Sequence, residues 1–178
     1  MKKNNKSKGI VFWITGLPGS GKTLLANLIQ KEINSIYGKS IVVSGDDLRK
    51  IFDLKGYTSS ERKKYLISYN KFCRFVTDQK INIIFAVVGL YDFIRKKNKK
   101  NLKNYVEIFI DSDINKIIEF KKKDIYKKKK NLMGVHIAAQ FPKKPDIIIK
   151  NDLKTKKNKL KSMLIKKILK HIKKWKIK

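Results

Sequence analysis

The residues with the plainest chemical meaning form one run near the start of the chain, residues 16–23, which reads Gly-Leu-Pro-Gly-Ser-Gly-Lys-Thr. Two glycines five residues apart, followed by Lys and then Ser or Thr, are typical of a phosphate-binding P-loop. Such a loop turns successive backbone N–H groups inward around an anion, and glycines permit that conformation. Lys22 could then reach the β- and γ-phosphates of a nucleoside triphosphate, and the Thr23 hydroxyl could ligate Mg²⁺.

The segments beside this loop have the patterns that it requires. Residues 10–14 form an uninterrupted apolar run, typical of a buried parallel strand. After the loop, apolar residues recur at helical spacing as far as Ile33, which predicts a helix that begins near Lys22. The positive dipole end of this helix would face the same phosphates. The strand and the helix together argue against the alternative, a chance glycine-rich turn.

A second group of chemically capable residues follows the next predicted strand, residues 40–44. The Asp46 carboxylate could bind Mg²⁺ through water or accept the proton of an attacking hydroxyl. The alternative for Asp46 is a helix N-cap, a role that Asp47 could fill equally well. Arg49 and Arg62 could each grip an acceptor phosphate through two hydrogen bonds, although Arg62 could instead lie on a solvated helix face.

The rest of the chain alternates predicted strands with predicted helices. Further strands are expected at residues 81–88, 105–110 and 146–149, and helices at residues 46–52, from 59 to about 76, 92–100, 114–120 and 157–178. This alternation predicts an α/β fold, a doubly wound parallel sheet of about five strands with helices on both faces. Ligands of such sheets gather at the carboxyl ends of the strands, here the P-loop, residues 45–49 and residues 89–92.

The 178 residues are expected to form one domain, with a basic tail at residues 1–8, a lid-like segment at 121–142 and a basic helix at 157–178. No apolar stretch is long enough to span a membrane, and the lysine-rich start lacks a signal-peptide pattern, so we expect a cytoplasmic protein. The apolar stripe of the last helix could rest on an acidic membrane surface, but we favour packing on the sheet, which needs the same stripe. The single cysteine, Cys73, is expected to be a buried apolar filler.

The formal net charge is +31, which raises the question of a nucleic-acid partner. Only four of the 45 basic residues are arginine, the residue favoured for reading bases, and no basic patch is interleaved with a row of aromatic residues. We therefore expect no specific nucleic-acid binding, and we interpret the lysines as a coding bias at permissive surface positions. The positive field should still attract a polyanionic substrate.

From residue 10 to about residue 150, the sequence resembles the adenylylsulfate (APS) kinase family. The resemblance is carried by residues 11–23, 45–49, 56–58 with 61–62, 125–128, 134–135 and 142–146. Members have a P-loop kinase fold and transfer the ATP γ-phosphoryl to the 3′-hydroxyl of adenosine 5′-phosphosulfate, which gives PAPS, the activated sulfate donor. The resemblance implies an ATP- and Mg²⁺-dependent phosphotransferase of sulfate assimilation, with APS as the default nucleotide acceptor. Homodimers are common in this family.

The resemblance also implies roles for individual residues. Lys22 and Asp46 would be catalytic, and Thr23 and Asp46 would hold the metal ion. Arg49 and Arg62 match acceptor-binding arginines. Tyr57 and Leu132 stand where the family has the two aromatics that enclose the acceptor adenine, and residues 121–130 match a lid over ATP. The predicted ATP-binding residues are Gly16, Leu17, Pro18, Gly19, Ser20, Gly21, Lys22 and Thr23.

Several positions depart from the family pattern. Ser44 replaces an aspartate, Tyr65 and Ser68 replace an Asn and an Arg, and the lid is about five residues shorter. The family segment Ile-Ser-Pro is here Val88-Gly89-Leu90, so no phosphoserine can form at Gly89, although direct in-line transfer does not need one.

Residues 89–95 are similar to a divergent branch of the family that is often found with surface-polysaccharide genes. At least one group in that branch is thought to phosphorylate the ribose of cytidine diphosphoramidate. The loss of one stacking aromatic at Leu132 fits a smaller or different base. Three functions therefore stay open: an APS kinase, a kinase of another nucleotide such as cytidine diphosphoramidate, and a degenerate P-loop protein that binds nucleotide without turnover.

Overall fold

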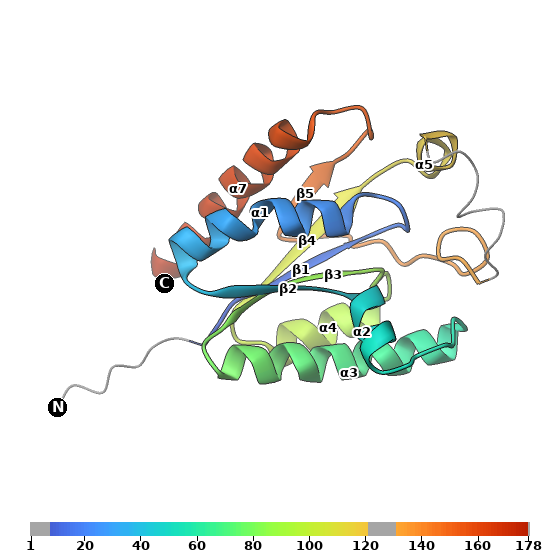
Figure 1. The fold of residues 1–178 in the computed structure, drawn as a ribbon, viewed down its shortest axis with the longest axis horizontal. Helices are drawn as coiled ribbons and strands as arrows, with labels where there is room; N and C mark the ends of the chain where they lie inside the picture. The colour runs from blue at the N-terminus through green and yellow to red at the C-terminus, as the bar shows by residue number, and fades with distance from the viewer. Residues whose placement is uncertain (1–7, 121–130, 178) are drawn as a thin grey trace.

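A parallel sheet of five strands, in the order β2-β3-β1-β4-β5, forms the centre of the molecule (Figure 1). The structure, a computed structural model, describes residues 8–120 and 131–177. The strands are β1 (Val11–Gly16), β2 (Ser40–Ser44), β3 (Asn82–Val87), β4 (Tyr105–Asp111) and β5 (Ile147–Lys150). The predicted α/β class and the five-stranded parallel sheet are confirmed. Strand β3 is one residue shorter at each end than the predicted strand, residues 81–88. The reason is that its ladder with β1 and β2 runs only from Asn82 to Val87.

The central strand β1 is buried along its whole length, as its uninterrupted apolar sequence predicts. Its side chains alternate between the two faces of the sheet. Phe12 and Ile14 pack into one apolar cluster with helices α1 (Lys22–Tyr37) and α7 (Lys157–Lys173). Trp13 packs into the other cluster, with helices α3 (Ser59–Asp78) and α4 (Asp92–Asn101). The sheet thus separates two cores, each covered by its own pair of helices.

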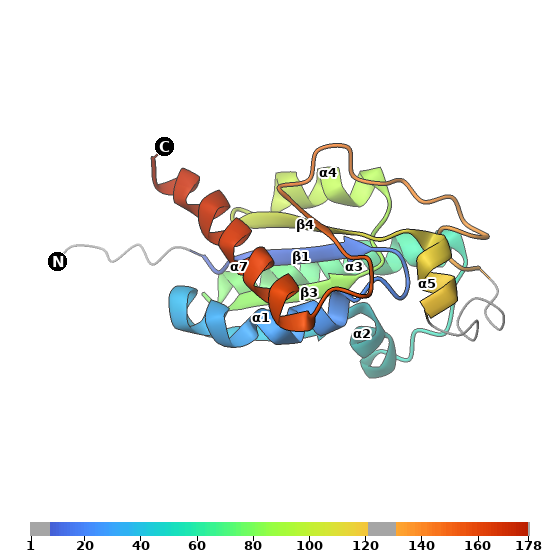
Figure 2. The same ribbon diagram turned by 90° about the horizontal axis from the view of Figure 1, so that it is seen from above.

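Helices α1 and α7 lie side by side over one face of the sheet (Figure 2). The apolar stripe of α7 is buried in the same cluster as Phe12, so the sheet occupies the face that a membrane would otherwise need. This stripe consists of Leu160, Leu164, Ile168 and Ile172. An ion pair between Lys161 and Glu32 ties α7 to α1. The predicted packing of this helix on the sheet is confirmed, but the helix ends at Lys173 and a 3₁₀ turn, η1 (Lys174–Ile177), follows it.

Two short helices follow strands at their carboxyl ends: α2 (Gly45–Ile51) directly after β2, and α5 (Ile114–Phe120) two residues after β4. The Asp113 side chain accepts hydrogen bonds from the backbone N–H groups of Asn115 and Lys116, as expected for a cap of α5. Cys73, on α3, is fully buried in the core, which confirms it as an apolar filler, and burial raises the pKa of its thiol. The predicted lid residues 121–130 and the tail before Lys8 lie outside the described residues.

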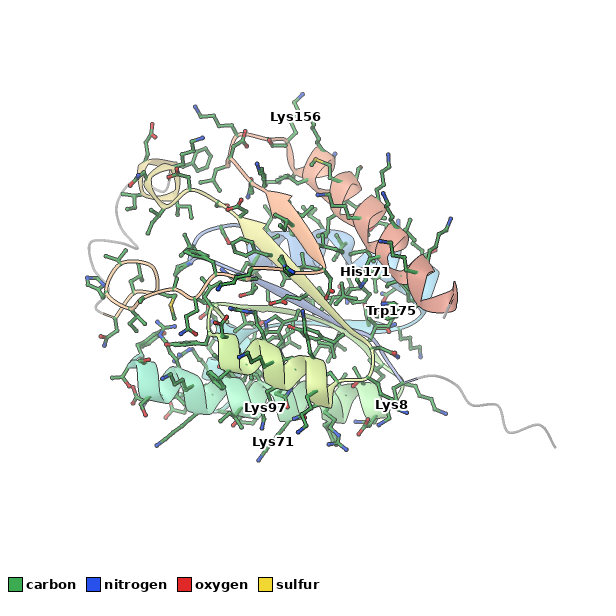
Figure 3. The ribbon with its side chains drawn as sticks, turned by 180° about the vertical axis from the view of Figure 1, so that it is seen from behind. Lys8, Lys71, Lys97, Lys156, His171 and Trp175 are labelled. Carbon is green, nitrogen blue, oxygen red and sulfur yellow. The ribbon has the colours of Figure 1, made fainter. Side chains whose placement is uncertain are left out.

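Lysine side chains extend into solvent on both sides of the sheet (Figure 3). Lys71 lies on α3, below the sheet in Figure 1, whereas Lys156 precedes α7, above it. The basic charge is therefore spread over more than one face of the molecule. The expectation that no nucleic acid is bound specifically stays a prediction. Among the described residues, no helix is both long and apolar enough to cross a bilayer.

Candidate active site

A cavity of about 720 Å³ opens at the carboxyl ends of β1, β2 and β3. The P-loop, α2, the start of α3, the end of β3 and the segment after residue 130 all contribute to its wall. Every residue predicted to act in catalysis, metal binding or acceptor binding lines this cavity: Lys22, Thr23, Asp46, Arg49, Tyr57, Arg62 and Leu132. Of the remaining P-loop positions, Pro18, Gly19 and Gly21 also line it, whereas Leu17 and Ser20 are buried in the loop. The fold thus brings together residues that are up to 110 positions apart, from Lys22 to Leu132.

The P-loop has the backbone that a phosphate cradle requires. Gly19 and Gly21 have φ values of 79° and 90°, in the left-handed region that favours glycine. Helix α1 begins at Lys22 directly after the loop, so its first N–H groups face the cavity mouth. The Lys22 ammonium is buried and donates to the Leu17 carbonyl oxygen at 2.7 Å. It therefore lies folded over the loop, within reach of any anion that enters it.

Asp46 and Asp47 have different roles at the start of α2. The N-cap is Ser44, whose hydroxyl oxygen accepts a hydrogen bond from the Asp47 backbone N–H at 3.1 Å. The Asp47 carboxylate in turn accepts from the Ser44 N–H and hydroxyl, both at 2.8 Å, which completes a capping box. The alternative that Asp46 or Asp47 is the N-cap is therefore wrong. Asp47 is committed to the cap, and Asp46 remains exposed on the cavity wall.

Two arginines converge on Tyr57 in the wall of the cavity. The Arg49 guanidinium lies 4.2 Å from the centre of the Tyr57 ring and 4.9 Å from that of Tyr65. It also donates to the carbonyl oxygens of Leu54 and Gly56, at 3.1 and 2.7 Å, which holds the loop after α2. The two ring contacts and two carbonyl bonds set the position of one positive charge in this wall.

Arg62 supplies the second positive charge of this wall, from the first turn of α3. Its guanidinium donates to the carbonyl oxygens of Tyr57 and Asn131, both at 3.0 Å. Burial lowers the pKa of Arg62, and the nearby charge of Arg49 lowers it further. Two guanidinium groups so close together stabilise a bound anion. The alternative, in which Arg62 lies on a helix face and contacts only solvent, does not account for these two hydrogen bonds.

The two residues predicted to enclose the acceptor base, Tyr57 and Leu132, differ in exposure. The Tyr57 side chain is 39% exposed and could stack on a planar base, whereas Leu132 is only 4% exposed. The Leu132 carbonyl accepts hydrogen bonds from the N–H groups of Val135, His136 and Ile137, so the backbone at Leu132 is held in a tight loop. Tyr57 therefore offers an aromatic face to the cavity, whereas Leu132 offers a compact aliphatic side chain.

Gly89, where the family pattern has a serine, is enclosed by the core. Its N–H donates to the Thr15 hydroxyl oxygen at 3.2 Å. A Cβ atom on Gly89 would lie 3.1 Å from Cζ2 of the buried Trp13 ring. Sequence reasoning did not anticipate this contact, because nothing in the local pattern of β1 indicates which loop meets its tryptophan.

Sequence reasoning also missed Asn151, which directly follows β5. Its side-chain amide donates to the Ser20 carbonyl oxygen of the P-loop at 3.0 Å. The position of Asn151 after a predicted strand, at the carboxyl edge of the sheet, was a signal that could have indicated it. Strand β4 lies between β5 and β1, so Asn151 and the P-loop do not belong to neighbouring strands. Their contact depends on where the chain leaves β5.

The residues present fit a magnesium ion bound together with nucleotide phosphates. Among the described residues, no three His, Cys, Asp or Glu side chains gather into an all-protein metal site. Mg²⁺ with a nucleotide needs only one or two protein oxygens, since phosphates and water complete its shell. The Thr23 hydroxyl and the Asp46 carboxylate both line the cavity and are oxygen donors of the required kind.

The model of the adenylylsulphate kinase family matches residues 8–150, which include the whole of this cavity. The chain belongs to this family. The match covers well over half of the 178 residues and places the P-loop, both arginines and Leu132 inside the family domain.

Relatives in this family carry two different activities in their names. A cytidine diphosphoramidate kinase of Campylobacter jejuni is 30% identical over 168 residues, which cover 92% of this chain and 98% of that protein. An adenylyl-sulfate kinase of Clostridium acetobutylicum is 30% identical over 155 residues, covering 83% of this chain and 78% of that protein. The structure of the Mycobacterium tuberculosis APS kinase in complex with AMPPNP and APS superimposes with a TM-score of 0.81 at 20% identity, over 91% of this chain and 98% of that one. This last likeness shows the common fold.

Proposed function

We propose that the protein is an ATP-dependent kinase that transfers the γ-phosphoryl group to a ribose hydroxyl of a small nucleotide. The observation that carries the proposal is the shared cavity, whose lining includes the P-loop, Asp46 and the two arginines beside Tyr57. Membership of the adenylylsulphate kinase family supports the reaction class. The cavity volume of about 720 Å³ is within the range of small-ligand sites.

The residues around the cavity suggest how the transfer would occur. Lys22 would exchange the Leu17 carbonyl for the β- and γ-phosphates, and the P-loop N–H groups would hold the same oxygens. Asp46 would accept the proton of the acceptor hydroxyl as its oxygen attacks the γ-phosphorus and the bond to the β,γ-bridging oxygen breaks, releasing ADP. Thr23 and Asp46 would hold Mg²⁺, which when bound neutralises charge on the phosphates.

For the acceptor, we favour cytidine diphosphoramidate over APS, which the sequence alone made the default. The named kinase of that compound in Campylobacter jejuni aligns with almost all of this chain. Of the two positions where the resemblance implies stacking aromatics, only Tyr57 is aromatic, and Leu132 is a buried aliphatic residue. This pair provides less stacking area than two aromatics would, and a pyrimidine requires less. The arginines Arg49 and Arg62 suit the diphosphate-like portion of either acceptor. APS, and with it sulfate assimilation, is the second candidate.

The test is ADP release by the purified protein with ATP, Mg²⁺ and each acceptor in turn. We expect a kcat/KM for cytidine diphosphoramidate that exceeds that for APS, and phosphorus NMR of the product should show a new phosphomonoester on the ribose. A clear preference for APS would overturn the favoured acceptor and leave the kinase assignment standing. Absence of ADP release with both acceptors, together with retained ATP binding, would support the third function, a nucleotide binder without turnover.

A further inference from the structure

Asn151 lies in the first position after β5 and is only 7% exposed. Its side-chain Nδ2 donates to the Ser20 carbonyl oxygen at 3.0 Å, across a sequence separation of 131 residues. Its Oδ1 accepts from the Leu153 N–H at 3.0 Å, which determines which end of the amide faces the P-loop. A buried amide with both ends paired holds its partners in one arrangement.

The backbone of Asn151 is itself anchored to the sheet. Its N–H donates to the Asp111 carbonyl oxygen at the end of β4, at 2.8 Å. This bond continues the parallel ladder between β4 and β5, whose last pair is Asp111 with Lys150. The side chain therefore projects from a residue whose backbone is hydrogen-bonded to the sheet.

The contact with Ser20 determines the direction of the next N–H group. The peptide bond between Ser20 and Gly21 is trans, so its C=O and N–H point to opposite sides. With the Ser20 oxygen held toward Asn151, the Gly21 N–H points away from Asn151. A Cβ atom on Gly21 would lie 3.0 Å from Asn151 Nδ2, so the glycine also permits the close approach of the amide.

We infer that Asn151 is a positioning residue for the triphosphate: it orients the Ser20–Gly21 peptide so that the Gly21 N–H faces the bound phosphates. This inference rests on the proposed ATP site. The amide itself does not touch the phosphates and acts through the P-loop backbone. A backbone N–H that is aimed before the ligand arrives spares the cost of ordering it during binding.

The chain offers a matched control in Asn82, at the start of β3 on the opposite edge of the sheet. Asn82 is 4% exposed, its Nδ2 donates to the carbonyl oxygens of Tyr37 and Gly38, both at 3.0 Å, and its Oδ1 accepts from the Ile10 N–H at 2.9 Å. Both asparagines are buried, and each uses its amide nitrogen as a donor to backbone carbonyls and its amide oxygen as an acceptor from a backbone N–H. Of the two, only Asn151 contacts the P-loop.

The experiment compares the full-length wild-type protein with Asn151→Ala, Asn151→Asp and Asn82→Ala. Calorimetry measures the Kd of a non-hydrolysable ATP analogue with Mg²⁺, thermal unfolding measures stability, and steady-state kinetics separate the KM for ATP from the KM for the acceptor. We expect Asn151→Ala to weaken analogue binding about tenfold, the effect of one well-placed hydrogen bond. Asn151→Asp should weaken it further, because a carboxylate cannot donate and repels the Ser20 oxygen. The acceptor KM at saturating ATP should not change.

Asn82→Ala should lower the unfolding temperature and leave the Kd of the analogue within twofold of wild type. Equal analogue affinity in wild type and in both Asn151 variants would overturn the inference, as would an equal loss of affinity in Asn82→Ala. If Asn151→Ala does not fold, the isosteric Asn151→Asp variant decides the same question. Failure of the wild type to bind the analogue would reject the proposed ATP site itself. The affinity of the wild type is therefore measured before that of any variant.

Discussion

The indole of Trp13 lies against the backbone of Gly89, so closely that a Cβ atom there would be 3.1 Å from Cζ2 and 3.2 Å from Nε1 of the ring. Trp13 is fully buried and stacks on Phe85 of β3, with ring centres 5.1 Å apart. The ring therefore cannot move aside easily. This pair gives a physical reason why a glycine stands where the family pattern has a serine.

Replacing Gly89 with Ala should destabilise the fold, because the added methyl group enters the contact zone of the indole. We expect a loss of about 1–2 kcal/mol in the free energy of unfolding, measured by urea denaturation. In a Trp13→Phe background the smaller ring leaves more room, so the same Gly89→Ala change should cost less. An equal cost in both backgrounds would show that the two residues do not interact.

Asp46→Asn should abolish most phosphoryl transfer without affecting stability. The carboxylate lies on the cavity wall outside the capping box of α2, so its loss removes the proposed proton acceptor and metal ligand alone. We expect kcat to fall at least about a hundredfold, and a similar loss for Lys22→Ala. Unchanged kcat in both variants would eliminate every enzymatic interpretation.

The neighbouring Asp47 is the matched control for that experiment. Asp47→Asn weakens the capping box with Ser44, so we expect a loss of about 1 kcal/mol in the free energy of unfolding and little change in kcat at temperatures where the protein is folded. The two adjacent carboxylates should thus separate stability from activity. A larger loss of kcat in Asp47→Asn than in Asp46→Asn would reverse the assigned roles.

Leu132→Phe should shift the acceptor preference toward a purine nucleotide. The new ring would add aromatic stacking area to the lining of the cavity, which favours the larger base. Base–aromatic stacking contributes about 1–3 kcal/mol, so the ratio of kcat/KM for APS to that for cytidine diphosphoramidate should rise about tenfold or more. Tyr57→Leu, as a control, should weaken both acceptors. No change in the ratio would remove Leu132 from base selection.

The start of α3 should lose stability in acid. Hydrogen bonds from the side chain and backbone N–H of Thr58 lower the pKa of Glu61, so the folded state favours the carboxylate. The contribution is therefore present above the ordinary Glu pKa and is lost as the pH falls through the lowered pKa of the folded state. Thermal unfolding from pH 7 to pH 3 should show a smaller decrease for Glu61→Gln than for wild type, and parallel curves would contradict this.

Much of the fold could be predicted from the sequence because its signals are local. The glycine spacing of residues 16–23, the apolar run before it and the helical periodicity after it each depend on a few neighbouring residues. The same holds for the strand that precedes Asp46. Since parallel strands bring their carboxyl ends to one edge, the order of segments was enough to predict that the P-loop and Asp46 lie at the same edge of the sheet. The expectation that Asp46 follows the strand next to the P-loop strand is wrong, because β3 lies between β1 and β2.

The tertiary structure decided which distant residues pair with one another. Asn151 meets Ser20, Trp13 meets Gly89 and Arg62 meets Asn131 only because the sheet order and the loop paths bring these segments together. The choice of Ser44 as the cap of α2 likewise depends on backbone angles that propensity does not determine. Local patterns thus determined the fold and the phosphate loop of this protein. The packing across the sheet decided which side chains contact that loop and which residues line the cavity together, since these depend on distances between residues far apart in the chain.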